Sequence, residues 1–279
     1  MNADRPLVRI RNLSKSFGSK QVLYDINLDV GAREIISIVG PSGSGKSTLL
    51  RCINRLEEQE LGEVWVGDDL MGFDVRENEA RRLSPAALAV QRRHIGMVFQ
   101  QFHLFRQMTV MQNMIEGPTR VLKMSRADAE QRAIRILEKV GLASRTGAFP
   151  SELSGGEQQR IAIGRSLAMS PSILLFDEPT SALDPERVGE VLDVIRDLAA
   201  ERAAAIVIVT HELDFAREIS NRIIFMDNGA IDRIVAPDAL LNEPTDTRFG
   251  RFLGQMYANR RHLDLPKPAT EPTEKKKKE

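Results

Sequence analysis

The spacing of apolar residues changes along this 279-residue chain and divides it into three stretches. In the first third, short apolar runs bounded by glycine and polar residues predict β-strands. These runs lie at residues 7–11, 27–30, 35–39 and 63–66. From residue 101 to residue 150 the pattern is helical, and after residue 157 helical and strand patterns alternate, as they do in βα units on a parallel sheet. We therefore expect an α/β fold with strands near the N-terminus, a helical middle stretch and a parallel sheet.

The clearest helix of the middle stretch is predicted over residues 125–140. Ser125 is a favourable N-cap residue, and Gly141 suits the left-handed conformation that ends many helices. Residues 74–93 are rich in arginine and follow no repeating pattern, so we expect a solvated helix or loop at the edge of the sheet. A phospholipid-binding or regulatory role for these arginines is the alternative.

A glycine-rich segment follows the strand predicted at residues 35–39 and fits the pattern G-x-x-x-x-G-K-[ST] of a phosphate-binding loop. It consists of Gly40, Pro41, Ser42, Gly43, Ser44, Gly45, Lys46, Ser47 and Thr48. Glycines let the backbone turn so that successive N–H groups point at an anion, and the helix predicted over residues 48–56 adds its positive N-terminal end. Lys46 is then placed to reach the β- and γ-phosphates, and the Ser47 hydroxyl to bind Mg²⁺. The segment therefore predicts a nucleoside triphosphate site.

Two acidic residues lie at the end of the buried strand predicted at residues 173–177. Asp177 is placed to hold Mg²⁺ through its water shell, and Glu178 to polarise the attacking water as a general base. Two solvated acids at a strand end would be the simpler interpretation in a chain without a phosphate-binding loop. Because this chain has such a loop, the two acids predict a nucleotide hydrolase.

A second candidate phosphate site is formed by Ser154, Gly155, Gly156 and Glu157, which have the S-x-x-E spacing of a helix capping box. A capping box by itself is purely structural. The two glycines, however, each lower helix stability by about 1 kcal/mol and leave the backbone N–H groups of the first turn bare, which suits an anion. One chain would then hold two phosphate-binding helix starts, more than a single nucleotide requires from one subunit.

These segments resemble the ATP-binding subunits of ABC transporters, whose signature is LSGGQ where this chain has LSGGE at residues 153–157. The resemblance runs from about residue 8 to residue 255. It implies that two subunits pair head to tail, with each ATP clamped between the phosphate-binding loop of one subunit and the signature of the other. Hydrolysis then requires a dimer, and Mg²⁺ is the metal that ATP brings.

The resemblance implies roles for four further residues, which are Phe17, Gln100, Asp184 and His211. Phe17 would stack on adenine in place of the more usual tyrosine; a core aromatic is the structural alternative. Gln100 would contact Mg²⁺ and sense the γ-phosphate, and the doubled glutamine leaves Gln101 as the alternative. Asp184 would lie in the loop that crosses to the partner subunit. His211, directly after a predicted strand, would contact the γ-phosphate.

The resemblance also implies partners and a location. Integral-membrane permease subunits would be separate chains, an extracytoplasmic solute-binding protein would act through them, and this chain would be peripheral on the cytoplasmic face of the inner (plasma) membrane. Residues 97–105 (MVFQQFHLF) and the C-terminal residues 248–253 are similar to the polar amino acid uptake group. A polar amino acid or related zwitterion such as ectoine is therefore the expected solute. Residues 106–107 and 111–113 depart from the group in the stretch that faces the permease, which leaves the permease open.

Two other kinds of ABC protein remain as alternatives. An ABC ATPase of a lipoprotein-release or division complex would share every ATP motif and differ only in its partner. A non-transport ABC ATPase usually joins two nucleotide domains in one chain, whereas one set of motifs is present here.

Composition restricts the partners further. Lysine plus arginine and aspartate plus glutamate each number 39, so there is no general basic field and no nucleic acid is expected. The longest apolar stretch, residues 203–209, is far shorter than the ~20 residues that span a bilayer, and no N-terminal targeting pattern is seen. The single cysteine, Cys52, fits a reducing compartment and a packing role.

We expect three regions along the chain. Residues 1–99 and 166–263 would form a RecA-like ATP-binding core with its antiparallel β subdomain, and residues 100–165 a helical subdomain that includes the signature. Residues 264–279 are rich in proline and lysine, cannot bury a core, and would be disordered.

Overall fold

The computed structural model describes residues 5–76, 79–241 and 243–263, so the predicted tail at 264–279 lies outside the described residues. Its main sheet is made of β3 (Ile35–Val39), β8 (Ile95–Val98), β9 (Ile173–Asp177), β10 (Ala205–Val209), β11 (Arg222–Asp227) and β12 (Ala230–Val235). The strands lie in the order β12-β11-β3-β10-β9-β8, and β12 alone among them pairs antiparallel. Every residue of β3, β9 and β10 is buried, as expected for parallel strands covered on both faces.

An antiparallel sheet comes from the N-terminal part of the chain. Its strands are β1 (Val8–Phe17), β2 (Lys20–Val30), β4 (Leu61–Val66) and β5 (Asp69–Leu70), in the order β2-β1-β4-β5. The predicted strands at 7–11 and 27–30 are only parts of β1 and β2. The pairing of β1 with β2 shifts register between Ile10 and Ser16, and Asn12 and Asp25 have left-handed backbones. These bulges break the alternation of apolar residues, which is why the sequence pattern underestimates the strands.

Eight helices are described. They are α1 (Lys46–Ile53), α2 (Pro85–Arg92), α3 (Val110–Arg120), α4 (Arg126–Lys139), α5 (Gly155–Ala168), α6 (Pro185–Glu201), α7 (Leu213–Ile219) and α8 (Arg248–Leu263). Short 3₁₀ turns are η1 (Ala143–Arg145), η2 (Pro150–Glu152) and η3 (Pro237–Leu241). The predicted helix at 125–140 is confirmed: the Ser125 hydroxyl accepts from the Asp128 N–H at 3.1 Å, and Gly141 has φ +70°. No helix among the described residues is long and apolar enough to cross a membrane.

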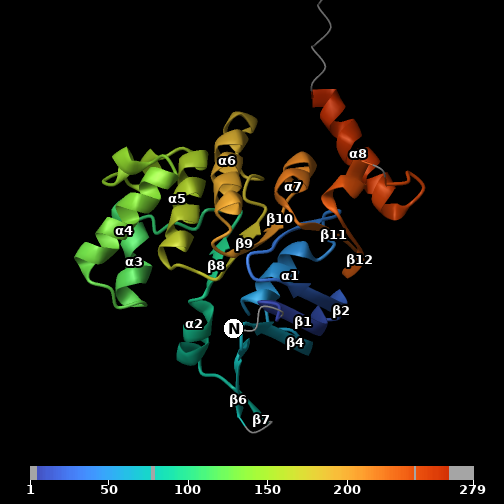
Figure 1. The fold of residues 1–279 in the computed structure, drawn as a ribbon, viewed down its shortest axis with the longest axis horizontal. Coiled ribbons are helices and arrows are strands. Elements are labelled where there is room, and N and C mark those ends of the chain that lie inside the picture. The colour runs from blue at the N-terminus through green and yellow to red at the C-terminus, as the bar shows by residue number, and fades with distance from the viewer. Residues whose placement is uncertain (1–4, 77–78, 242, 264–279) are drawn as a thin grey trace, which may run out of the picture.

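The main sheet separates two apolar clusters of buried residues. Alternate residues of a strand face opposite sides, so Ile173 and Leu175 of β9 join one cluster and Leu174 and Phe176 join the other. The first cluster includes buried side chains of α1 and of the antiparallel sheet, and the second includes buried side chains of α3, α4, α5 and α6. In Figure 1, α3, α4 and α5 lie together at the end of the sheet that β8 occupies. The fold is thus the α/β arrangement that the sequence predicts.

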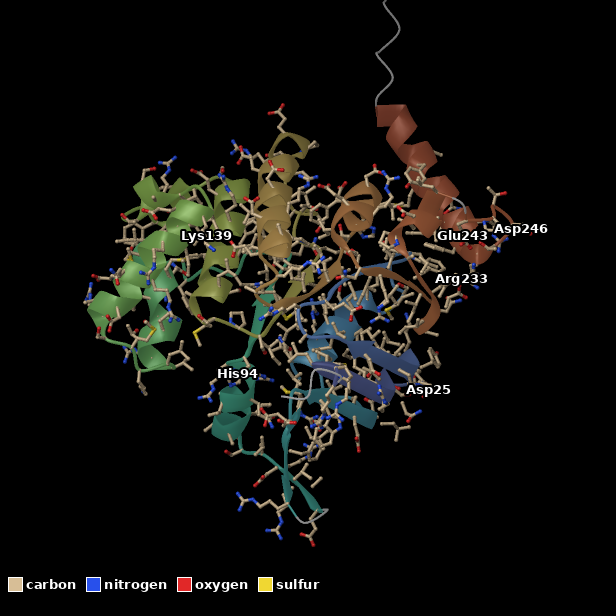
Figure 2. All side chains as sticks on the ribbon, viewed as in Figure 1. Asp25, His94, Lys139, Arg233, Glu243 and Asp246 are labelled. Carbon is tan, nitrogen blue, oxygen red and sulfur yellow. The ribbon has the colours of Figure 1, made fainter. Side chains whose placement is uncertain are left out.

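The C-terminal part packs on the other end of the sheet. Phe249 of α8 is fully buried and stacks on Phe225 of β11 with ring centroids 4.6 Å apart. Figure 2 shows Arg233 of β12 beside Glu243, and its guanidinium donates to that carboxylate at 2.7 Å. The Thr247 hydroxyl donates to the same carboxylate oxygen at 2.7 Å. These contacts hold the start of α8 against the sheet.

The arginine-rich segment is a hairpin followed by a helix. The hairpin strands are β6 (Phe73–Arg76) and β7 (Glu79–Arg82), and α2 comes next. The predicted helix or loop is therefore right for α2 and misses the hairpin, whose strands of four residues each are too short for the alternation at Phe73 and Val75 to be recognised. Its arginines have acidic partners: Arg76 with Asp74 at 2.9 Å, Arg81 with Glu79 at 3.1 Å, and Arg82 with Glu58. The hairpin is thus close to neutral in its local charge.

Candidate functional site

The carboxyl ends of three adjacent strands place the predicted chemical groups at one edge of the main sheet. The order β3-β10-β9 puts the glycine-rich loop after β3, His211 after β10, and Asp177 with Glu178 at the end of β9. The Glu178 N–H donates to the Val209 carbonyl of β10 at 3.0 Å, which fixes the two strand ends together. Ligands of open α/β sheets bind at this edge. The sequence predicts this grouping, and the structure has it.

The glycine-rich loop has the backbone that a phosphate cradle needs. Gly40, Gly43 and Gly45 have φ values of +149°, +79° and +94°, which residues with a side chain rarely adopt. A Cβ at Gly40 would collide with the Met226 carbonyl, and one at Gly45 would lie 2.7 Å from Leu23 Cδ2. Gly45 is the N-cap of α1 and provides no side-chain cap, so the first N–H groups of α1 remain available to an anion.

Lys46 extends back across this loop. Its ammonium donates to the carbonyls of Gly40 and Pro41, both at 2.9 Å, and the residue is 4% exposed. Burial lowers the pKa of Lys46, while the carboxylates of Glu178 and Asp177 oppose that shift. A buried cation next to bare helix N–H groups forms an anion site.

Asp177 has the properties of a metal ligand. It is 3% exposed; its Oδ2 accepts from Arg51 at 3.4 Å, and its Oδ1 is buried with no hydrogen-bond partner among the described residues. An unpaired buried carboxylate oxygen is costly, and a cation would satisfy it. The described residues contain no cluster of three His, Cys, Asp or Glu that could bind a metal by themselves. Mg²⁺ typically uses one or two carboxylates together with substrate phosphates.

Glu178 and His211 form a pair beside the loop. His211 Nε2 lies 3.0 Å from Glu178 Oε1, and the Ser181 hydroxyl donates to the Glu178 carbonyl at 2.9 Å. The pKa of Glu178 is lowered, and the hydrogen bond with His211 is the largest cause. The carboxylate therefore stays ionised. Glu178 also has φ +48°, a strained conformation for a residue with a side chain.

The second predicted phosphate site begins α5. The Ser154 hydroxyl accepts from the Glu157 N–H at 3.3 Å, and the Glu157 carboxylate accepts from the Ser154 N–H at 2.8 Å, which confirms the capping box. Arg145 adds an ion pair to Glu157 at 3.1 Å, and these hydrogen bonds, with the Ser154 backbone first, lower the pKa of Glu157. A Cβ at Gly155 would lie 3.3 Å from the Leu183 side chain. The glycines therefore also allow close packing, a role that the sequence does not reveal.

Three predicted residues lie at the surface. Phe17 ends β1 and is 47% exposed, so the structural alternative of a core aromatic is wrong. Gln100 is exposed just after β8, and Asp184 is exposed as the N-cap of α6 with no side-chain cap hydrogen bond. The structure also reveals two residues that no motif predicts: Arg51 beside Asp177, and Lys15, whose ammonium lies 4.6 Å from the centroid of the Phe17 ring.

Comparison with known proteins agrees with this geometry. The ABC transporter family model matches residues 23–181. A glutamine transport ATP-binding protein of Geobacillus stearothermophilus is 47% identical over 250 residues, which cover 90% of this chain and 99% of that protein. An L-cystine transport system ATP-binding protein of Escherichia coli is 49% identical over 248 residues, which cover 88% of this chain and 96% of that protein.

Solved structures give the same answer. A dimeric ATP-binding cassette in a post-hydrolysis state bound to ADP and Pi matches with a TM-score of 0.70 and 35% identity, covering 82% of this chain and 98% of that one. A dimeric bacterial ABC transporter cassette matches with a TM-score of 0.71 and 34% identity, again covering 82% of this chain and 98% of that one. The chain therefore belongs to the ABC transporter family, as an ATP-binding subunit with the fold of a P-loop ATPase.

Proposed function

We propose that this chain hydrolyses ATP to drive the uptake of a polar amino acid or a related zwitterion through separate permease subunits. The observation that supports the hydrolysis most directly is the grouping of Lys46, Asp177, Glu178 and His211 at one sheet edge. The solute class follows from relatives that match nearly this whole chain, among them glutamine, cystine and nopaline transport proteins.

The residues of one subunit divide the work of hydrolysis. The loop from Gly40 to Thr48 cradles the phosphates with its backbone N–H groups, and Lys46 binds the β- and γ-phosphates. Ser47, Gln100 and Asp177 would hold Mg²⁺, which would neutralise phosphate charge when bound. Glu178, kept ionised by its hydrogen bond with His211, accepts a proton from the attacking water. General-base assistance of this kind contributes roughly 10²–10⁴-fold in rate.

A second copy of the chain completes the site. The start of α5, with Ser154, Gly155 and Gly156, would contact the γ-phosphate bound to the partner's loop in a head-to-tail homodimer. Asp184, at the exposed start of α6, would cross to the partner, and Phe17 would stack on adenine. Two solved cassettes with this fold are dimeric, which supports the pairing.

The remaining assignments concern organisation and location. We assign residues 1–99 and 166–263 to the ATP-binding core and residues 100–165 to a helical subdomain that docks on the permease. The two share an apolar layer, since Phe176 of β9 and Leu137 of α4 belong to one cluster. The subunit would lie on the cytoplasmic face of the membrane, bound to its permease, and a solute-binding protein outside would deliver the solute.

Purification from the native host tests the function. The tagged chain is recovered from gently solubilised membranes, and the co-purifying proteins are identified. A polytopic permease, together with stimulation of ATP hydrolysis by a solute-binding protein loaded with an amino acid, supports the proposal. Recovery with ribosomes or with a lipoprotein-releasing complex would contradict import while leaving the ATP chemistry in place. Glu178→Gln serves as the matched control: it is expected to purify with the same partners and to lack hydrolysis.

A further inference from the structure

We infer that Lys15 is a positioning residue for the adenine-binding ring of Phe17, and that Glu60 holds Lys15 in place from the loop behind the phosphate-binding helix. The inference rests on the proposed stacking role of Phe17. Neither Lys15 nor Glu60 belongs to any motif that the sequence shows.

Lys15 is an unusual lysine because its side chain is only 11% exposed. Lysines are rarely buried unless they are paired. Its ammonium lies 3.4 Å from Glu60 Oε1 and 4.0 Å from Glu57 Oε2, and it also lies over the Phe17 ring, 4.6 Å from the centroid. The ammonium is therefore held between two carboxylates and one aromatic ring.

The contact with the ring orients Phe17. A cation over an aromatic ring is attracted by the negative face of the ring, and the attraction grows when the cation is desolvated. Phe17 is 47% exposed, so the ammonium covers part of the ring and leaves area for a base. A ring that is already oriented loses less conformational freedom when a base stacks on it, which favours binding.

Glu60 connects this ring to the phosphate-binding half of the site. Its Oε2 accepts from the Ser16 N–H at 2.5 Å, and its own N–H donates to the Ser14 carbonyl at 3.1 Å. The loop that contains Glu60 follows α1, and within it the Glu57 N–H donates to the Arg51 carbonyl of α1 at 3.0 Å. The segment that ends in Phe17 is thus tied to the helix that begins at the phosphate-binding loop. The ring proposed to stack on adenine and the loop proposed to bind the phosphates are therefore connected through the residues that follow α1.

Calorimetric titration of the full chain tests the inference, with ADP·Mg²⁺ and tripolyphosphate·Mg²⁺ as the two probes. ADP has the base and is not hydrolysed, and tripolyphosphate has no base. Lys15→Met keeps the length and apolar stem of the side chain and removes the charge. We expect it to weaken ADP binding by roughly three- to tenfold, the effect of immobilising a ring that is no longer held in place, and to leave tripolyphosphate binding unchanged. Lys15→Arg, which keeps a cation over the ring, is expected to retain ADP binding.

A double-mutant cycle separates positioning from a general structural role. In a Phe17→Ala background, Lys15→Met is expected to have no further effect on ADP binding. Three results would each overturn the inference. Lys15→Met could weaken the binding of ADP and of tripolyphosphate equally, or it could weaken ADP binding as much in the Phe17→Ala background as in the unmodified chain. The third result is that Phe17→Ala itself leaves ADP binding unchanged.

A second variant and a separate readout complete the design. Thermal melts confirm that each variant is folded. If Lys15→Met fails to fold, Glu60→Gln loosens the ammonium instead and is expected to weaken ADP binding, again only when Phe17 is present. Failure of the proposed function would be seen in other measurements. Recovery of the chain without a permease would overturn import, and ATP turnover that does not depend on Glu178 would overturn the proposed hydrolysis; neither result would change these ADP affinities.

Discussion

The capping boxes at the starts of α3 and α5 allow the structural role of Ser154 to be separated from its proposed contact with ATP. At the start of α3, the Thr109 hydroxyl accepts from the Gln112 N–H at 3.3 Å, and the Gln112 side chain accepts from the Thr109 N–H at 2.8 Å. At the start of α5, Ser154 and Glu157 form the same two bonds at 3.3 and 2.8 Å. Both N-cap residues are half-buried. Thr109→Ala is therefore a matched control for Ser154→Ala.

The expected loss of stability is the same for the two variants. Replacing a serine or threonine N-cap by alanine costs about 1 kcal/mol, and for a chain of this size that lowers the melting temperature by about 2–3 °C. Ser154 has a second role in the proposed dimer, where its hydroxyl would donate to the γ-phosphate bound to the partner. Losing a hydrogen bond to a charged group costs about 1.5–3 kcal/mol, so Ser154→Ala is expected to lower hydrolysis by roughly ten- to a hundredfold. Thr109→Ala is expected to hydrolyse ATP as the unmodified chain does.

Steady-state hydrolysis and thermal melts of the three proteins provide the comparison. Hydrolysis is measured at saturating ATP and well below the lowest melting temperature, so that every protein is folded. If both variants lose hydrolysis equally, the serine acts only as a helix cap, and the second phosphate site is refuted. Full activity of Ser154→Ala would refute it as well.

Three further predictions concern the composite site, its base and the single cysteine. Ser154→Arg and Lys46→Ala are each expected to be inactive alone, and mixing the two proteins should restore hydrolysis. A mixed dimer contains one site in which the phosphate-binding loop of one subunit and the signature of the other are both intact. No recovery of hydrolysis on mixing would contradict the head-to-tail pairing. The hydrogen bond with His211 lowers the pKa of Glu178, so in His211→Ala that pKa should rise and the acid limb of the residual activity should move to higher pH in a pH–rate profile. Burial raises the pKa of Cys52 to about 12, so thiol reagents should modify it only after unfolding, as the rates of alkylation in buffer and in denaturant would show.

The sequence predicts most of the candidate site because its groups are each local in the chain. The glycine-rich loop lies within nine consecutive residues after β3, and Asp177 and Glu178 directly follow a continuous apolar run. Strands of this kind must be parallel and buried on both faces, and parallel strands present their carboxyl ends on one side. Local sequence therefore places Lys46 and Glu178 near each other without any knowledge of long-range contacts.

What the sequence does not predict depends on contacts between distant residues. Arg51 beside Asp177 joins residues 126 positions apart, and Lys15 beside Glu60 joins residues 45 positions apart. The hairpin of β6 and β7 has arginine–carboxylate pairs, and its strands of four residues each are too short to give a clear periodic signal. The packing of Gly155 against Leu183 likewise depends on how α5 approaches the start of α6.

The signature helix α5 is also bonded to the segment that contains Gln100. The Gln159 side chain donates to the Phe99 carbonyl at 3.2 Å, and Arg165 donates to the His103 carbonyl at 2.8 Å. These two bonds hold the backbone on both sides of Gln100, and both come from α5. In the proposed dimer, the N-terminus of α5 contacts the partner's nucleotide while Gln100 contacts the nucleotide of its own subunit. In that dimer, we expect a shift of α5 after hydrolysis at one site to move the segment that contains Gln100, the residue proposed to contact Mg²⁺ at the other site.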